Sequence, residues 1–403
     1  MCYTGPKETQ KERPTMGALT GYKILDFSTL LPGPYATMTL ADLGAEVLKI
    51  SSKDKYDLVV GWKPVIEGAQ VTGPQAWLGR NKKTIHLNLK KPAAIEAVKK
   101  LVLEYDILVE QFRPGVMAKL GIGYQDLKAI NPRLIYCAIT GYGQAGPFAM
   151  RAGHDINYLS RAGITYAAGR KVGGPSLYNF QIADVAGGSM NAVASILAAI
   201  IHREKTGEGQ FLDVSMQDSV LPFNTMDGAA YFAGGPLPTR ESGYLNGGEI
   251  YDFYETSDGA YMSVGSLEPK FFADLCKGLG CPEWQDGAIL KTDVALVKET
   301  FWAKFKTKTR DEWTAIFQKL DACVEPVMSL EEVAADEHLH SRGMWPTLEV
   351  PVSDGVTITQ MGCPLNLSVC PPEYRHAGYP EGWHTREVLT ELGYSPDEIE
   401  DMI

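Results

Sequence analysis

The chain lacks the patterns that identify several common classes of protein. Its seven cysteines are scattered through 403 residues and form no CxxC pair. An odd number of scattered thiols is typical of a reducing compartment, and it predicts neither a disulfide framework nor a zinc site. Basic residues are outnumbered, with 38 Lys and Arg against 49 Asp and Glu, so the formal net charge is −11. Because a phosphate backbone requires a basic surface, we expect no nucleic-acid partner.

Long apolar runs are also scarce. The longest nearly unbroken run, Ala192 to Ile201, is shorter than the ~20 residues that a membrane-spanning helix needs. The N-terminus opens with polar and charged residues and contains no apolar core of a signal peptide. We therefore expect a soluble, cytoplasmic protein that has no membrane partner and in which residues 1–16 form a flexible tail.

Three signatures of nucleotide-binding and hydrolytic enzymes are missing as well. No GxGxxG follows the first expected strand, and no GxxxxGK(S/T) loop occurs in the chain. Their absence argues against a dinucleotide-binding enzyme and against a P-loop NTPase. No GxSxG elbow occurs either, which argues against an α/β-hydrolase.

What the sequence does contain is a repeated alternation of strands and helices. A strand is expected at 22–27, a helix at 35–43 and a second strand at 46–50, with a Pro/Gly loop and Gly44 between them. Strand, helix and strand within ~30 residues predict a βαβ unit and hence a parallel sheet. Further strands are expected at 84–89, 107–110, 134–139 and 211–214. The expected fold is therefore α/β, with a large Rossmann-like domain.

The strongest helix signal lies at 184–203. The segment opens with Asp184, a preferred N-cap residue, and continues through the small residues 186–189. Its second half is almost wholly apolar, which predicts a helix buried in the core or in a subunit interface.

The composition changes after about residue 220. A stretch rich in Gly and Pro, 232–248, is expected to be an extended linker, and short strands and helices follow it. This pattern predicts a smaller α+β domain. The expected domain bounds are 17–227 for the first part of the large domain, 228–330 for the small domain with its linker, and 331–403 for the return to the large domain.

Three titratable residues occupy positions where catalysis is plausible. His154 and Asp155 come after a Gly/Pro loop that follows an expected strand, and ligands bind at the carboxyl ends of parallel strands. The two side chains could form an acid/base site, or Asp155 could cap a helix beside a histidine that only packs. Asp184 has the same two interpretations, as a helix cap or as a carboxylate that faces a cleft.

Basic residues gather in the loops of the first domain, where a phosphate could bind. They are Lys49, Arg80, Lys82, Lys83 and Arg113. Taken singly, each of them is as consistent with an ordinary solvated surface residue.

Seven short segments are more specific when they are taken together and in order. They are LPGP at 31–34, LADLGAEVLKI at 40–50, GRNKK at 79–83, FRPGV at 112–116, GYGQAGP at 141–147, ADVAGG at 183–188 and KTGEGQ at 205–210. In this order the chain resembles the family III CoA-transferases and their relatives, the 2-methylacyl-CoA racemases. The likeness extends from about residue 17 almost to the C-terminus, and the motifs are most like those of the racemases.

The resemblance implies roles for the titratable residues. Asp184 would be the catalytic carboxylate, which acts as a nucleophile in the transferases and as an acid/base group in the racemases. His154, in GHDINY at 153–158, would be the partner base, and Glu268, in VGSLEP at 264–269, would orient it, perhaps from the other subunit. A racemase needs one base on each face of a planar enolate, and His154 and Asp184 would be those two bases.

The resemblance also implies an acyl-CoA substrate and an interlocked homodimer, although a heterodimer with a related subunit is an alternative. Coenzyme A would arrive as part of the substrate, and neither a metal nor a tightly bound cofactor is expected. The residues expected to bind coenzyme A are Lys49, Arg80, Lys82, Arg113, Gly141 and Tyr142.

One departure from the racemase pattern keeps a second activity open. Phe180 stands where the racemases carry an Asn, and Asn179 lies one position earlier. The racemase interpretation, in which a 2-methylacyl-CoA is inverted at its α-carbon, is favoured because His154 is present. The alternatives are a CoA-transferase with Asp184 as nucleophile and a non-catalytic subunit that binds acyl-CoA.

Overall fold

The structure is a computed structural model that describes residues 16–55 and 57–403. The tail predicted at 1–16 therefore lies outside the described residues, except for Met16. The described chain forms two compact units. The first contains the residues up to Tyr158, Gln181–Val220 and His338–Ile403, and the second contains Leu159–Phe180 and Leu221–Glu337. The predicted bounds differ from these units mainly at residues 159–180, which were expected in the large domain.

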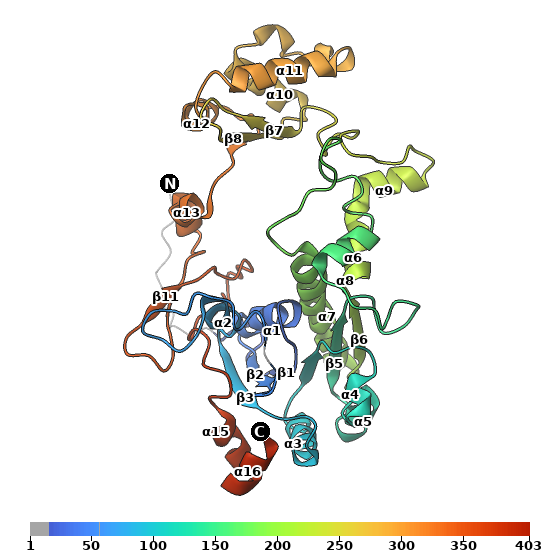
Figure 1. Cartoon of the computed structure of the whole chain (residues 1–403), viewed down its shortest axis with the longest axis vertical. Coiled ribbons are helices and arrows are strands. Elements are labelled where there is room, and N and C mark those ends of the chain that lie inside the picture. The colour runs from blue at the N-terminus through green and yellow to red at the C-terminus, as the bar shows by residue number, and fades with distance from the viewer. Residues whose placement is uncertain (1–15, 56) are drawn as a thin grey trace, which may run out of the picture. The chain divides into compact units, whose positions relative to one another are not determined.

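A six-stranded parallel sheet forms the centre of the first unit, with the order β3-β2-β1-β4-β5-β6 (Figure 1). The strands are β1 Lys23–Asp26, β2 Glu46–Ser51, β3 Lys82–His86, β4 Ile107–Glu110, β5 Ile135–Thr140 and β6 Phe211–Ser215. This is the order of the classic doubly wound sheet. The prediction of an α/β fold with a parallel sheet is confirmed.

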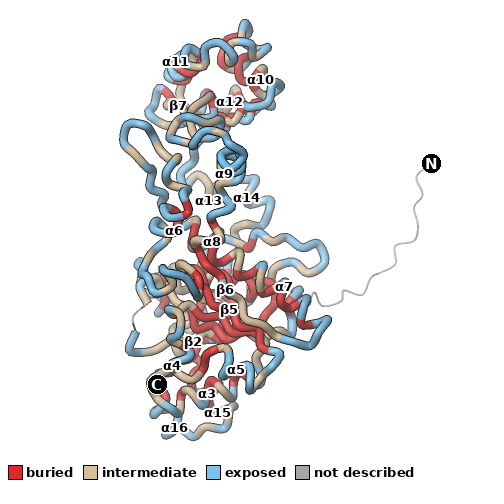
Figure 2. Tube along the Cα trace, turned by 90° about the vertical axis from the view of Figure 1, so that its right-hand side faces the viewer, coloured by how far each residue is buried: buried red, intermediate tan, exposed pale blue. Residues whose placement is uncertain are grey.

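Helices cover both faces of this sheet, which explains why its inner strands are deeply buried. Every residue of β4 and β5 is buried (Figure 2), as is typical of parallel strands that are covered on both sides. The helices up to Tyr158 are α1 Pro32–Asp42, α2 Gly73–Leu78, α3 Pro92–Val102, α4 Val116–Lys119 and α5 Tyr124–Ile130; α6, Asp155–Arg161, begins in this unit.

The strand order places a topological switch point between β1 and β4. From these two neighbours the sheet continues to β2 and β3 on one side and to β5 and β6 on the other. Ligands of open α/β sheets bind in the crevice outside the carboxyl ends of such strands. The loops that follow β1 and β4 are therefore the first place to look for a site.

The predicted helix at 184–203 begins earlier than expected, and its first part is not an α-helix. A π-helix, η1 Ile182–Ser189, runs directly into α7 Met190–Thr206. The prediction that Asp184 is the N-cap is wrong, because the N-cap position is Gln181 and Asp184 lies inside the first turn. Together the two helices are long and apolar enough to cross a membrane by length and composition, but they pack on α1, β5 and β6 as a core helix.

The C-terminal segment returns to the first unit. It contains α14 Glu337–Ser341, the strand pair β10 Thr347–Glu349 and β11 Thr357–Thr359, α15 Thr385–Glu391 and α16 Pro396–Met402. α15 contacts β3, and α16 contacts α3. The first unit also contains α8 Met216–Val220, which follows β6.

The second unit has a three-stranded antiparallel sheet, in which β8 lies between β7 and β9. Its elements are η2 Leu221–Asn224, α9 Thr225–Phe232, β7 Asp252–Glu255, β8 Tyr261–Val264, α10 Pro269–Leu279, η3 Pro282–Trp284, η4 Ala288–Lys291, α11 Val294–Phe305, α12 Arg310–Phe317, β9 Val324–Pro326 and α13 Leu330–Ala334. Its core is rich in aromatic rings, including Tyr254, Phe272, Phe301, Phe305 and Trp313.

Candidate active site

Asp155 caps the π-helix that carries Asp184. One oxygen of its carboxylate, Oδ1, accepts hydrogen bonds from the backbone N–H of Ala183 at 2.5 Å and from that of Asp184 at 3.1 Å. These amides belong to the first turn of a helix, whose N–H groups have no partner inside the helix. The cap therefore comes from a residue distant in sequence, and the carboxylate of Asp184 is not used as a cap.

His154 lies immediately before Asp155, at the start of α6. Its backbone N–H donates to Oδ1 of Asn157 at 3.0 Å, and its carbonyl accepts from the N–H of Asn157 at 2.8 Å. These bonds fix the backbone at the start of the helix, while His154 as a whole is exposed. His154 therefore adjoins in sequence the residue whose carboxylate caps the turn of Asp184.

Burial and the neighbouring charge of Asp155 raise the pKa of Asp184. Burial is the largest cause for Asp184, and the charge of Asp155 adds to it, so that the pKa of Asp184 rises to about 7. Burial also raises the pKa of Asp155, although the N–H groups of Asp184 and Ala183 oppose that rise. A carboxyl with a pKa near 7 can accept and release a proton at neutral pH, as acid/base catalysis requires.

The glycine-rich loop after β5 packs against the same turn. A side chain at Gly141 would meet the ring of Tyr158, since an added Cβ would lie 2.4 Å from Cε1. The hydroxyl of Tyr158 donates to the carbonyl of Gly153 at 2.5 Å, and its ring lies 5.2 Å from that of Tyr142 in an edge-on arrangement. Gly141 and Tyr142 therefore lie beside the backbone that carries His154.

A buried serine joins the turn of Asp184 to the loop after β1. The hydroxyl of Ser189 is shared between the carbonyl of Pro32 at 2.6 Å and the carbonyl of Asp184 at 3.1 Å. Gly188 lets the two segments approach, because an added Cβ would lie 2.9 Å from Cγ of Met216. Sequence reasoning missed Ser189, which reads as one more small residue of the helix.

The loop after β1 covers a buried cluster of charges. Asp26 at the end of β1 lies 3.3 Å from the ammonium of Lys82 and 3.7 Å from that of Lys49. Burial would raise the pKa of Asp26, but Lys49 and Lys82 outweigh it and lower that pKa to about 2. Burial lowers the pKa of Lys82 to about 8, against the opposing effect of Asp26. Both groups of the Asp26–Lys82 pair are therefore charged at neutral pH.

The bonds of Lys82 limit its use as a phosphate ligand. Its ammonium donates to the carbonyl of Pro34 at 2.8 Å and to the hydroxyl of Thr37 at 2.7 Å, and Lys82 is almost fully buried. Lys49 also donates to the carbonyl of Ser28, but 14% of its side chain is exposed. Of the two predicted lysines, Lys49 is the one that reaches a surface a ligand could touch.

Arg80 is tied into the fold. Its guanidinium forms a two-pronged ion pair with Asp42, at 3.0 and 2.6 Å, and also donates to Gln360 at 3.2 Å and to the carbonyl of Met361 at 2.9 Å. Its exposed fraction is 0%. Arg80 therefore joins α1 to the C-terminal segment, and its position does not offer it to a phosphate.

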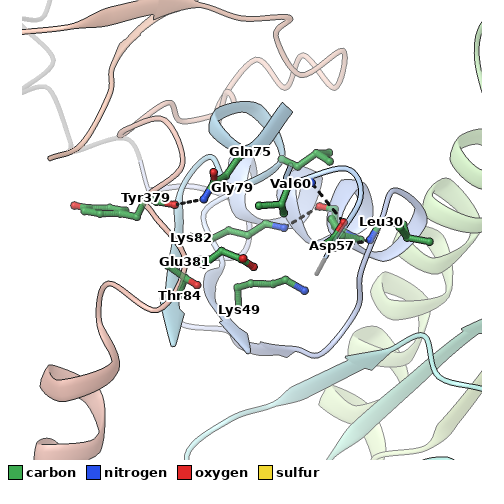
Figure 3. Close-up of a pocket in the computed structure, with 12 residues that line it drawn as sticks. Leu30, Lys49, Asp57, Val60, Gln75, Gly79, Lys82, Thr84, Tyr379 and Glu381 are labelled. Atoms are coloured by element: carbon green, nitrogen blue, oxygen red, sulfur yellow. Dashed lines mark hydrogen bonds between the residues drawn. The ribbon is translucent and has the colours of Figure 1, made fainter. Parts of the chain in front are cut away.

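A small cavity of about 50 Å³ lies in front of Lys49 (Figure 3). Its lining combines apolar and charged residues, namely Leu30, Pro34, Lys49, Asp57, Val60, Gln75, Leu78, Gly79, Lys82, Thr84, Tyr379 and Glu381. Lys49 and Glu381 both extend toward Leu30, in the loop after β1, and Asp57, in the loop after β2 (Figure 3). The cavity could take only part of a ligand. Sequence reasoning missed Tyr379 and Glu381, because nothing local connects them with strands that lie some 300 residues earlier.

The two remaining predicted residues lie in different surroundings. Arg113 follows β4 at the switch point. Unlike the buried Lys82 and Arg80, it is exposed. Glu268 belongs to the second unit, where it precedes α10 as the N-cap residue and is exposed. Within the described ranges 16–55 and 57–403, no group of three or more His, Cys, Asp or Glu residues could hold a metal ion.

Known proteins resemble this chain over nearly its whole length. The family model described as CoA-transferase family III matches residues 19–385. Human alpha-methylacyl-CoA racemase is 35% identical over 95% of this chain and 95% of its own, and mouse succinyl-CoA:glutarate CoA-transferase is 31% identical over 98% of this chain and 91% of its own. The crystal structure of a CAIB/BAIF family protein from Brucella suis matches with a TM-score of 0.80, at 28% identity, over 94% of this chain and 100% of its own. The chain belongs to the CoA-transferase family III, which contains both racemases and CoA-transferases.

Proposed function

We propose that the protein is an acyl-CoA racemase that inverts the α-carbon of a 2-methylacyl-CoA thioester. The observation that carries this proposal is the protonation of Asp184, whose pKa rises to about 7 in a turn that Asp155 caps. Such a carboxyl is suited to exchange a proton near neutral pH. The neighbouring turn carries His154, whose imidazole is the second group proposed to transfer a proton.

In this mechanism the thioester carbonyl makes the α-hydrogen acidic. One of the two groups, His154 or Asp184, removes that hydrogen and leaves a planar enolate, and the other returns a proton to the opposite face. For the reverse inversion the two groups exchange roles. Asp155 acts by holding the backbone of Asp184 through its two hydrogen bonds, and Glu268 would orient the imidazole of His154.

Coenzyme A binds in this proposal as part of the substrate. Lys49 and the cavity in front of it take a small part of the coenzyme, and the exposed Arg113 meets a phosphate. Gly141 and Tyr142 lie beside the turn of His154 and flank the thioester end. Lys82 and Arg80 support these loops from below through their buried ion pairs. The protein works as an interlocked homodimer.

A second candidate is a CoA-transferase in which Asp184 attacks the thioester. Phe180 favours it, since racemases carry an Asn at that position, and so does the similarity to a succinyl-CoA:glutarate CoA-transferase. A nucleophilic carboxylate must be ionised, and a pKa near 7 reduces its ionised fraction at neutral pH. For this reason the racemase is our first choice.

One assay separates the two activities. The purified protein is incubated with (R)-2-methylacyl-CoA in D2O without added acid, and the α-hydrogen is followed by NMR. A racemase incorporates deuterium and loses optical purity, and His154→Ala stops the exchange. Absence of exchange, with transfer of CoA once a free carboxylic acid is supplied, would contradict the racemase and support the transferase.

A further inference from the structure

Thr84 of the edge strand β3 forms three hydrogen bonds with the C-terminal segment, beside the bond that the N–H of His86 donates to the hydroxyl of Thr385 at 2.9 Å. The backbone N–H of His384 donates to the carbonyl of Thr84 at 2.9 Å, and the backbone N–H of Thr84 donates to Nδ1 of His384 at 3.2 Å. The N–H of Gly382 donates to the hydroxyl of Thr84 at 3.2 Å. These hydrogen bonds therefore join this segment to the unpaired edge of β3.

The second of these bonds fixes the protonation state of His384. A backbone N–H can only donate, so Nδ1 of His384 must offer a lone pair. The imidazole is then neutral, with its proton on Nε2. A doubly protonated imidazole has two N–H donors and no acceptor, and it would place N–H against N–H at Thr84.

The surroundings of His384 favour the neutral form. His384 is 6% exposed, and the ring of Tyr379 lies 4.4 Å away in an edge-on arrangement. Burial is the largest cause that lowers the pKa of His384, and Lys83 and His376 lower it further. Glu387 and the hydrogen bond with the backbone of Thr84 oppose this shift, and the net pKa is lowered. The charges of Lys83 on β3 and Glu387 on α15 shift the pKa of His384 in opposite directions. Burial therefore decides that this pKa is lowered.

The same segment forms one wall of the cavity in front of Lys49. Its Tyr379 and Glu381 line the cavity, and the carbonyl of Tyr379 accepts from the side-chain amide of Gln75 at 3.2 Å (Figure 3). Gly382 lies directly against the imidazole of His86, where a Cβ would fall 2.0 Å from Cδ2. The segment therefore has little room to shift as long as its bonds to Thr84 hold.

We propose that His384, in its neutral form, is a positioning residue for the coenzyme site, because it holds Tyr379 and Glu381 in the cavity wall. Protonation of His384 loosens this wall. The inference rests on the proposed coenzyme site, and it adds that pH controls the binding of coenzyme A there. In unfolded chains histidine titrates near pH ~6.5. Because the folded form disfavours the proton, the pKa of folded His384 lies below that value, and the bond to Thr84 is intact above this lowered pKa and weakens as the pH falls through it.

The test compares the wild type with His384→Asn in two measurements, at pH 7.5 and 5.5. Asn carries Oδ1 at the same distance along the side chain as Nδ1 of histidine, so it keeps an acceptor for Thr84 but does not titrate. The first measurement is hydrogen exchange at the amide of Thr84, which needs no ligand. The second is calorimetric binding of coenzyme A, with His202→Asn, an exposed histidine on α7, as a matched control.

Amide exchange is base-catalysed and slows on acidification in any chain, so the quantity compared is the protection factor, the intrinsic exchange rate at each pH divided by the observed rate. We expect acidification to lower the protection factor of the Thr84 amide in the wild type and in His202→Asn, but not in His384→Asn. We expect affinity for coenzyme A to fall about three- to tenfold more in the wild type than in His384→Asn. The phosphates of coenzyme A and the carboxyl of Glu381 also titrate, but they are common to all three proteins. Equal pH dependence in the wild type and His384→Asn would overturn the inference. A wild type that binds no coenzyme A at pH 7.5 would instead overturn the coenzyme site, while exchange at Thr84 still tests the neutral His384.

Discussion

Two carboxyls in the first unit, those of Asp26 and Asp184, have pKa values that are shifted in opposite directions. Asp26 is fully buried between the ammonium groups of Lys49 and Lys82, and its pKa falls to about 2. Asp184 is half-buried, the charge that acts on it is the like charge of Asp155, and its pKa rises to about 7. The difference lies in the neighbours, since burial raises the pKa of both carboxyls. The cations of this region stabilise the fold, whereas the carboxyl of Asp184 can carry a proton near neutral pH.

The largest effect is expected from Asp184→Asn, which removes the proton carrier and keeps its shape. If Asp184 is one of the two bases, exchange of the α-hydrogen should fall about 10²- to 10⁴-fold, while the hydrogen bonds from residues 183 and 184 to Asp155 remain. Deuterium incorporation measures the loss, and circular dichroism checks the fold. Exchange within a few-fold of the wild type would remove Asp184 from the chemistry.

A large loss of stability is expected from Lys82→Met, which leaves Asp26 buried beside a single lysine. Removing one partner of a buried ion pair typically destabilises a protein by about 3–5 kcal/mol. Urea unfolding measures the change, and the exposed Lys83→Met is the matched control, since Lys83 pairs with Glu387 at the surface. Equal stability of the two variants would show that the Asp26 cluster is not structural.

A smaller effect, a shift along the pH axis, is expected from Asp155→Asn. The charge of Asp155 raises the pKa of Asp184, so its removal should lower that pKa, while the amide oxygen can still accept from the backbone. The limb of the rate profile that reports Asp184 should therefore move to lower pH. The profile of the exchange rate between pH 5 and 9 measures the shift, and a limb that moves to higher pH would contradict the account.

Much of the fold could be predicted because it depends on local patterns. The bounds of β4, Ile107–Glu110, agree with the prediction, since a short apolar run between turn signals is typical of a strand buried on both sides. The α-helical interpretation of the segment at Asp184 failed in its first turns. The π-helix there accompanies the close packing of Gly187 and Gly188 against Val220 and Met216, and these contacts involve residues after β6.

The candidate site could be predicted only where its residues carry a motif. Asp155 lies against the turn of Asp184, but the hydrogen bonds that this turn donates to it were not foreseen. The catalytic roles of His154 and Asp184 stay predictions. Arg80 looked like a phosphate ligand, because a basic residue beside a strand has no visible partner in the sequence. Its partners are Asp42 on α1 and Gln360 in the C-terminal segment, and tertiary packing alone brings them together.

The most direct test of the account is the titration of the Asp184 carboxyl itself. The protein is labelled with ¹³C at the aspartate carboxyl carbons, the resonance of Asp184 is assigned by its loss in Asp184→Asn, and its chemical shift is followed from pH 4 to pH 9. The account predicts a midpoint at about 7, which moves to lower pH in Asp155→Asn. A midpoint near the ordinary aspartate value of about 4 would contradict it, because Asp184 would then be an ionised carboxylate at neutral pH, as a transferase nucleophile requires.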